Sequence, residues 1–470
     1  MTVISKTAQR WVLALTSTAS FMVALDLLVV STALTSIRLD LGASIERVQW
    51  TVTAYGLSFA VLLLTGAALG DRFGRRRVFT IGLGLFATAS AGCALSPDVG
   101  WLITARAVQG AGAALVMPLA VALLSADTPP QRRGRALGIF EGLTGLATIA
   151  GPPVGGAVAQ LIGWEWIFWV NVPIALLMIP LVVLRVGESH GSDTTLDVRG
   201  LVLVTGGALG LVWGLVRGNE SGWTSPGVVA ALAAGTVLML AFIGWELRTR
   251  EPMLPMQLFG SRAFSGATGA SFLLFAALYG SVFFLAQFMQ TGLGYTPLEA
   301  GLRLVPWTAT LFVVAPLAGA LADRFGNRPI LAGGLVLQAA GLAWIAMIAA
   351  PDVGYPALVL PLVINGIGAS MAIPVVQNAV LGAVAPDQVG KASGANNMTQ
   401  ELGGVFGVAI LVAVFTTVGS YASAVAFIDG FTIAIGACAA LACGAAIAAL
   451  AVPRPRLIPP QVVPTGEMSA

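Results

Sequence analysis

Charged residues, histidine and cysteine are all scarce in this sequence of 470 residues. Only 10% of the residues are charged, whereas a soluble domain carries about a quarter; 57% are hydrophobic, and the mean hydropathy is +0.89. The single histidine, His190, lies in a polar loop, and Cys93, Cys438 and Cys443 lie in apolar runs without metal-ligand or disulfide spacing. No phosphate-loop lysine motif occurs. These absences exclude a soluble enzyme, a metal site and an ATP-driven machine, and they indicate a chain embedded largely in lipid.

Fourteen apolar runs are long enough to cross a bilayer, which takes about 20 residues. They are Trp11–Val30, Trp50–Leu69, Val78–Leu95, Trp101–Leu124, Ala136–Leu161, Trp166–Leu184, Gly200–Val216, Gly227–Trp245, Phe264–Met289, Ala300–Leu321, Ile330–Ala349, Ala357–Leu381, Ala392–Val418 and Phe431–Ala451. Of the 24 lysines and arginines, nineteen fall in the segments assigned to the inner side, four in outer segments, and Arg106 inside a run. Because basic residues collect on the cytoplasmic side, we expect an all-α polytopic membrane protein with fourteen spans and both termini cytoplasmic.

A short polar motif occurs twice, as LGDRFGRRR at residues 69–77 and as LADRFGNR at residues 321–328. Each copy follows the second span of its half, and their separation exceeds six spans by about the length of two more spans with their loops. We therefore predict a six-helix bundle over residues 1–190, an inserted pair of helices over 191–250, and a second six-helix bundle with a short tail over 251–470. Parallel repeats around a cavity at the bilayer midplane are a transporter architecture.

Both copies of the motif predict an ion-pair latch where a helix ends on the cytoplasmic side. The first acid lies just past the end of its span, with arginines beside it and a glycine that permits a tight turn. The candidate residues are Asp71, Arg72, Gly74, Arg75 and Arg76 in the first copy, and Asp323, Arg324 and Gly326 in the second. Arginines that only anchor the topology are the alternative, but an anchor needs neither an embedded acid nor a second copy. Because the first copy has four arginines and the second has two, we expect the first to dominate closure of the cytoplasmic side.

Four charged residues fall deep inside predicted spans: Asp26, Arg106, Glu141 and Glu401. A charge at that depth is costly unless it faces a cavity, is paired or is protonated. Asp26 is therefore a candidate for proton exchange, and Glu141 and Glu401 are candidates for a second proton or for a cationic group of a substrate. Arg106 does not readily deprotonate, so it would act on a nearby acid rather than carry the proton. For each of the four, a structural bond to a neighbouring helix is the alternative.

The fifth run contains Gly151, Pro152, Gly155 and Gly156. Small residues at four-residue spacing permit close helix packing, and the prolines bend the helix because they cannot donate to its backbone ladder. Other polar and aromatic groups could line a path for a bulky amphipathic cation through apolar and cation–π contacts. They are Tyr55, Gln109, Gln287, Trp307, Asn365, Gln377 and Asn397. For each of these, ordinary packing between helices is the alternative.

Taken together, the Asp71 motif, the Arg106 stretch and the Gly151 stretch resemble the major facilitator superfamily. The fourteen-span layout resembles its drug:proton antiporter branch, in which the glycine-proline motif marks exporters and the arginine is implicated in proton transfer. The acid of that branch's first-span motif matches Asp26, but Leu28, Ser31 and Thr35 replace its threonine, asparagine and proline. The detailed lining of the family therefore does not carry over.

The resemblance implies proton-coupled efflux of hydrophobic or amphipathic, often cationic, drugs by alternating access in a bacterial cytoplasmic membrane. A dedicated exporter of one metabolite or antibiotic is the alternative, followed by an importer. A membrane enzyme is disfavoured because no nucleophile or metal constellation is present. We expect protons, lipid and small molecules as partners, no nucleic acid, no cofactor, and function as a monomer.

Overall fold

The computed structural model describes residues 6–191, 197–250, 252–385 and 388–453. Every predicted apolar run coincides with a helix or a group of consecutive helices. The first half contains α1 (Lys6–Asp40), α2 (Ile45–Phe73), α3 (Arg75–Ala94), α4 (Val99–Asp127), α5 (Pro130–Leu161), α6 (Trp166–Trp169) and α7 (Asn171–Arg185), and α8 (Val198–Ser221) and α9 (Pro226–Glu246) follow. The second half contains η1 (Met256–Gly260), α10 (Arg262–Gln287), η2 (Phe288–Gly292), α11 (Pro297–Arg303), α12 (Val305–Thr308), α13 (Thr310–Phe325), α14 (Asn327–Ile348), α15 (Tyr355–Leu381), α16 (Val389–Phe415) and α17 (Ala424–Ala449).

Thirteen helical segments of the described chain are long and apolar enough to cross a membrane. Helix α5, with 32 residues, covers the remaining predicted run. The all-helical architecture with thirteen to fourteen spans is therefore confirmed. The cytoplasmic placement of the termini and the exact domain limits remain predictions. We call the end of the bundle that carries Asp71 the hinge end, and the other end the far end.

Local sequence signals set where these helices begin and end. Asp98 caps α4 by accepting from the backbone N–H groups of Gly100 (2.7 Å) and Trp101 (3.0 Å), which have no partner within the helix. Gly74 ends α2 with a φ of 104°, and Gly326 ends α13 with a φ of 88°. Only glycine adopts such angles without steric cost, so the repeated motif produces the same sharp turn in both halves.

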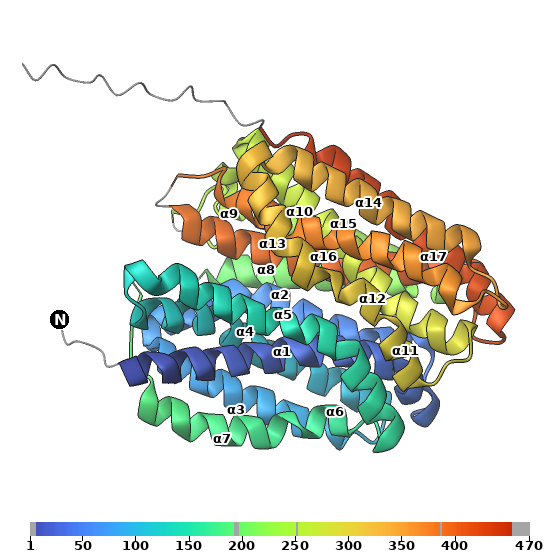
Figure 1. Ribbon diagram of the computed structural model, residues 1–470, viewed down its shortest axis with the longest axis horizontal. Helices are drawn as coiled ribbons and strands as arrows, with labels where there is room; N and C mark the ends of the chain where they lie inside the picture. The colour runs from blue at the N-terminus through green and yellow to red at the C-terminus, as the bar shows by residue number, and fades with distance from the viewer. Residues whose placement is uncertain (1–5, 192–196, 251, 386–387, 454–470) are drawn as a thin grey trace, which may run out of the picture.

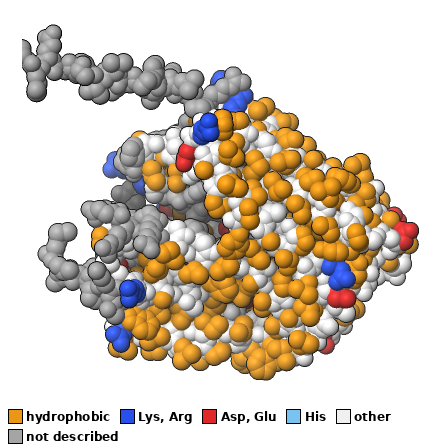
Figure 2. All heavy atoms as spheres, in the orientation of Figure 1, with side chains coloured by type: hydrophobic (Ala, Val, Ile, Leu, Met, Phe, Trp, Pro, Cys, Tyr) orange, Lys and Arg blue, Asp and Glu red, His pale blue; other side chains and the backbone are white. Residues whose placement is uncertain are grey.

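The two halves lie against each other along the long axis of the molecule, as Figure 1 shows for the blue-to-green and yellow-to-red helices. Hydrophobic side chains cover the middle of the face seen in Figure 2, and charged side chains gather toward its two ends. This distribution fits a body whose central belt contacts lipid. Helix α8 packs against both α2 and α16, so the inserted pair touches both halves.

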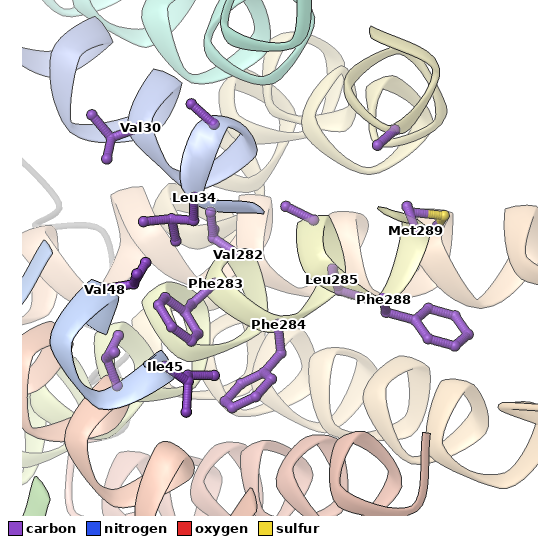
Figure 3. Close-up of a cluster of buried hydrophobic side chains, with 14 of the residues drawn as sticks. Val30, Leu34, Ile45, Val48, Val282, Phe283, Phe284, Leu285, Phe288 and Met289 are labelled. Atoms are coloured by element: carbon purple, nitrogen blue, oxygen red, sulfur yellow. The ribbon is translucent and has the colours of Figure 1, made fainter. Parts of the chain in front are cut away.

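At the far end the halves share one hydrophobic core. Figure 3 draws Val30 and Leu34 of α1 with Val282, Phe283 and Phe284 of α10 in one buried cluster, in which Leu34 lies beside Val282 and Phe283. All five of these residues are buried. Packing of these apolar side chains on one another holds the two halves together at the far end.

Candidate functional site

The buried charges of the first half form one ion pair. Asp26 of α1 is 2% exposed and Arg106 of α4 is 0% exposed. Nη1 of Arg106 lies 2.5 Å from Oδ2 of Asp26. The sequence named both residues as candidates, and the structure brings them into direct contact. Since either charge alone would be costly at this depth, each residue accounts for the presence of the other.

Three further polar side chains complete the Asp26 cluster. The side-chain amides of Gln109 and Asn171 donate to Oδ1 of Asp26 at 2.9 and 3.0 Å. The same amides approach the hydroxyl of Ser90 at 2.7 and 3.3 Å. Gln109 was expected to line a substrate path, but here it holds the carboxylate. Asn171 and Ser90 were not among the predicted site residues; the only signal for Asn171 was an amide at the start of an apolar span.

Aromatic rings enclose the guanidinium of Arg106. Its carbon Cζ lies 4.1 Å from the centre of the Tyr55 ring and 5.6 Å from that of Phe168. Its Nε donates to the backbone oxygen of Thr51 at 3.1 Å, while Nη2 has no hydrogen-bond partner in the described structure. Tyr55 also lines the cavity described next, so one side chain contacts both the cluster and that cavity.

A cavity of about 610 Å³ lies between the two halves. Helices α1, α2, α4 and α5 line it from one half, and α10, α12, α13, α15 and α16 from the other. Most of its lining side chains are apolar. The exceptions include Tyr55, Tyr279 and the acid Glu401. The hydroxyl of Tyr279 lies 3.3 Å from Oε1 of Glu401, and Oε2 has no hydrogen-bond partner among the described residues. An apolar chamber with one acid among its described lining residues suits a bulky ligand that carries a positive group.

Of the residues expected to line a substrate path, Tyr55 and Trp307 line this cavity. The buried Gln287 donates to the backbone oxygen of Phe283 at 2.9 Å. Asn365 is fully buried, and neither polar atom of its side chain has a partner in the described structure. Oε1 of Gln377 accepts from Asn396 at 2.5 Å. The described cavity lining does not include these three amides or Asn397, and the side chain of Glu141 lies outside the described residues.

At the far end, the glycines of the α5 motif allow helices to touch. A Cβ built on Gly151 would meet Leu28 at 2.7 Å, and one on Gly155 would lie 3.0 Å from Cα of Val29. A Cβ on Gly156 would collide with the backbone of Pro297 in α11. In return, a Cβ on Gly301 of α11 would collide with the backbone of Pro152. The motif therefore seats α5 against both α1 and the other half.

Polar contacts reinforce this interface between the two halves, which we call the far-end seam. Gln290 donates to the backbone oxygen of Thr32 at 2.9 Å, and the backbone N–H of Leu298 donates to Gln160 at 3.1 Å. The guanidinium of Arg38 lies 4.5 Å from the centre of the Tyr421 ring. These contacts between the halves all lie at the far end, so the described structure is sealed on that side of the cavity.

At the hinge end, Asp71 lies in the last turn of α2 rather than past its end, and Nε of Arg75 lies 2.7 Å from its carboxylate. The expected pair between the acid and an arginine is therefore present. Glu188, which the sequence did not single out, accepts from the backbone N–H of Arg76 at 2.9 Å and of Arg77 at 3.3 Å. These N–H groups begin α3, where a helix favours negative charge.

Other residues of the first motif have separate partners. Arg76 also donates to the backbone oxygens of Val183 and Val186, each at 3.2 Å. Arg72 lies over the ring of Phe73 at 5.3 Å. Thus the predicted cluster does not act through one ion pair alone; it ties α2, α3 and the segment after α7 together.

The second copy of the motif is built more simply. Asp323 is exposed, and no ion pair of this residue occurs in the part of the chain that the structure describes. Arg324 lies over the ring of Phe325 at 5.2 Å. This contact and the turn at Gly326 reproduce the first copy, whereas an ion pair like that of Asp71 with Arg75 does not recur among the described residues. The expectation that the first motif dominates closure remains a prediction, and this difference in contacts is consistent with it.

The comparison with known proteins identifies the family. The profile of the Major Facilitator Superfamily matches residues 16–278 and 267–467. The chain belongs to this superfamily. It is a multi-pass membrane transporter rather than an enzyme, as the resemblance of its motifs implied.

Its similar proteins are bacterial drug-resistance exporters. The tetracenomycin C resistance and export protein of Streptomyces glaucescens is 35% identical over 83% of this chain and 73% of its own length. The multidrug resistance protein Stp of Mycobacterium tuberculosis is 33% identical over 84% of this chain and 73% of its own length. The puromycin resistance protein pur8 of Streptomyces alboniger is 34% identical over 86% and 82%. The chain is therefore a member of the antibiotic-resistance exporter group of the superfamily.

Solved structures agree on the fold. A peptide transporter POT in complex with sulfate superposes with a TM-score of 0.70 at 17% identity, covering 94% of each chain. A bacterial homolog of the human lysosomal transporter Spinster gives a TM-score of 0.66 at 18% identity, covering 95% of this chain and 98% of that one. At this level of identity the likeness concerns the fold alone.

Proposed function

We propose that this transporter exports hydrophobic or amphipathic drugs and antibiotics from a bacterial cell in exchange for protons. The observation that carries the proposal is the juxtaposition of two sites. An apolar cavity between the halves has one acid, Glu401, among its described lining residues, and the ring of Tyr55 both lines that cavity and lies 4.1 Å from Cζ of Arg106. A site for substrate and a site for a proton thus share one side chain.

Proton binding would act through the charge pair. A proton on Asp26 cancels its negative charge, which leaves the buried guanidinium of Arg106 without a counter-ion. Arginine keeps its own proton, so the pair relaxes only by moving Arg106 or its neighbours. Gln109 and Asn171 lie on different helices, α4 and α7, and both bond to the same carboxylate. Protonation would therefore loosen three helices of the first half together.

Substrate binding would act on the same region from the cavity. Aromatic faces attract cations, most strongly where water is excluded, and Tyr55 and Tyr279 both face the cavity. The unpartnered Oε2 of Glu401 adds a negative group on the opposite half. A lipophilic cation would be held between these groups, whereas a neutral compound would rely on the apolar walls.

In alternating access, the far end and the hinge end of the cavity would open and close in turn. The far end is sealed by the packing of α5 on α11 and by the contact of Arg38 with Tyr421. Release of substrate requires this seam to open while the hinge end closes. The glycine contacts of α5 allow the close approach in one state, and the Asp71 motif would set how readily the hinge end changes state.

A dedicated exporter of one antibiotic is the second candidate, favoured by relatives whose names refer to single compounds, tetracenomycin C and puromycin. The test is a panel of antibiotics and lipophilic cations measured for accumulation in bacterial cells with and without the protein, repeated with a protonophore. Lower accumulation of several unrelated compounds, restored by the protonophore, supports multidrug export. An effect on one compound supports the dedicated exporter. No effect on any compound, or an effect that the protonophore leaves intact, contradicts the proposal.

We further propose that the protein acts as a monomer in the cytoplasmic membrane.

A further inference from the structure

A pair of carboxyl groups lies where the inserted helices begin and end, at the hinge end of the molecule. Asp197 caps α8 by accepting from the backbone N–H of Gly200 at 2.8 Å. Its two oxygens also accept from the indole N–H of Trp245, the penultimate residue of α9, at 2.9 and 3.0 Å. Asp197 therefore joins the start of α8 to the end of α9.

Glu246, the last residue of α9, is 3% exposed. Its Oε2 accepts from the backbone N–H of Leu254 at 2.9 Å. Its Oε1 is buried and has no conventional hydrogen-bond donor in the described structure. A Cβ built on Gly200 would lie 2.6 Å from both this atom and Oδ2 of Asp197. The two carboxyl oxygens thus face the same small space.

The charges around the pair do not balance two carboxylates. From α8 the facing groups are Asp197 itself and Arg199, whose guanidinium lies over the ring of Trp245 at 5.0 Å. From α9 the facing acid is Glu246, and from the segment before η1 the facing groups are backbone amides. Neither acid forms an ion pair in the described chain. Two carboxyl groups that face one small space favour a shared proton, because two adjacent anions repel each other and Oε1 of Glu246 has no donor among the described residues.

The pair connects the inserted helices to the segment that leads into α10. Leu254 lies between the inserted helices and α10, the first long helix of the second half, and it is buried in a core cluster with Val204 of α8. Helix α8 packs in turn against α2 and α16. Whatever loosens the bond between Glu246 and Leu254 therefore frees the inserted pair from the segment that leads into the second half.

We propose that Asp197 and Glu246 form a proton-binding site, separate from the Asp26 cluster, which fastens the inserted helices to the segment before α10. The bound proton lies between Oδ2 of Asp197 and Oε1 of Glu246. Asp197 is partly exposed, so the proton exchanges with the aqueous phase at the hinge end. Loss of the proton at higher pH leaves two carboxylates in contact, and their repulsion withdraws Glu246 from the Leu254 amide. This site does not depend on the proposed drug export.

Hydrogen exchange measured by mass spectrometry on the purified full-length protein tests the proposal directly. The readout is the protection of the peptide that contains Leu254, corrected for the intrinsic rate, between about pH 5.5 and 8.5. Because opening is linked to the release of one proton, protection should fall up to tenfold per pH unit above the transition. In Glu246→Gln the new amide donates to Asp197 and its oxygen still accepts from Leu254, so protection should stay high and independent of pH. Asp352→Asn, at an exposed acid of the α14–α15 turn, should behave like the wild type.

Constant protection in the wild type, or an unchanged pH dependence in Glu246→Gln, would overturn the proposal. If Glu246→Gln does not fold, Asp197→Asn serves the same purpose, since its amide can donate to Glu246. Drug export has no part in this readout, so its presence or absence leaves the result intact.

Discussion

Replacement of Asp26 by asparagine is the perturbation whose consequences the structure defines most closely. The two side chains have the same shape, so Asp26→Asn removes a charge without opening a cavity. In the wild type, one oxygen of Asp26 faces Arg106 and the other accepts from Gln109 and Asn171. The new amide has one oxygen for Arg106, and its NH2 group then points at two donors. The variant therefore loses the ion pair and places donors against donors.

The expected cost follows from the burial of Arg106. Removal of one partner from a buried ion pair destabilises a protein by about 3–5 kcal/mol, since the other charge stays buried and uncompensated. Arg106 is 0% exposed, so solvent does not screen it in the described state. We expect Asp26→Asn to lower the free energy of unfolding by about this amount, and to abolish gradient-driven export.

The assay combines reversible denaturation in mixed micelles with uptake into inverted vesicles. The control is the double variant Asp26→Asn/Arg106→Gln, in which a neutral pair replaces the charged one. Because neutral replacements of buried ion pairs are often tolerated, the double variant should recover most of the lost stability while still failing to couple export to protons. Unchanged stability together with wild-type pumping in Asp26→Asn would refute the role given to this cluster.

Three further substitutions test the other parts of the account. Asp71→Asn should slow transport while lowering stability by about 1 kcal/mol, since the ion pair with Arg75 is partly buried and still reached by solvent. Asp323→Asn should have the smaller effect on turnover, and equal effects would contradict the dominance of the first motif. Gly156→Ala should hold the far end open, which would increase the labelling of cysteines introduced there. Gly138→Ala should not, because a Cβ at that position meets no neighbour within 4 Å. Equal labelling of the two variants would show that the close approach of α5 is unimportant. Glu401→Gln should reduce export of lipophilic cations at least tenfold, for an interaction of about 1.4 kcal/mol, and leave neutral compounds unaffected; a parallel loss of both would make Glu401 a structural residue.

The length of the apolar runs and the placement of basic residues were sufficient to predict the helices, because a span needs about 20 apolar residues and its flanking basic residues mark its ends. The repeat of Asp71 and Asp323 likewise indicated two halves. The contact between Asp26 and Arg106 was not predictable from sequence spacing, since it depends on how α1 packs on α4. What could be predicted was only that each charge needed a partner.

The amides show the limits of the sequence most clearly. Gln109, Gln287 and Asn365 are chemically suited to line a path, yet packing places Gln109 against Asp26 and buries the other two away from the described cavity lining. Asn171 and Glu188 carry contacts that no local pattern distinguished. A polar side chain in an apolar span predicts a need for a polar partner, but not which helix supplies it, and Asn365 has none among the described residues.

The central claim is that a proton gradient drives substrate against its own concentration through the cavity beside Asp26. Purified protein in proteoliposomes with an acidic interior, supplied with a fluorescent lipophilic cation outside, tests it most directly, with Asp26→Asn as the paired sample. The account predicts accumulation of the cation above its external concentration in the wild type, collapse of that accumulation on addition of a protonophore, and no accumulation in the variant. Equilibration to the same level with and without the gradient, in a preparation that binds the cation, would contradict proton-coupled export.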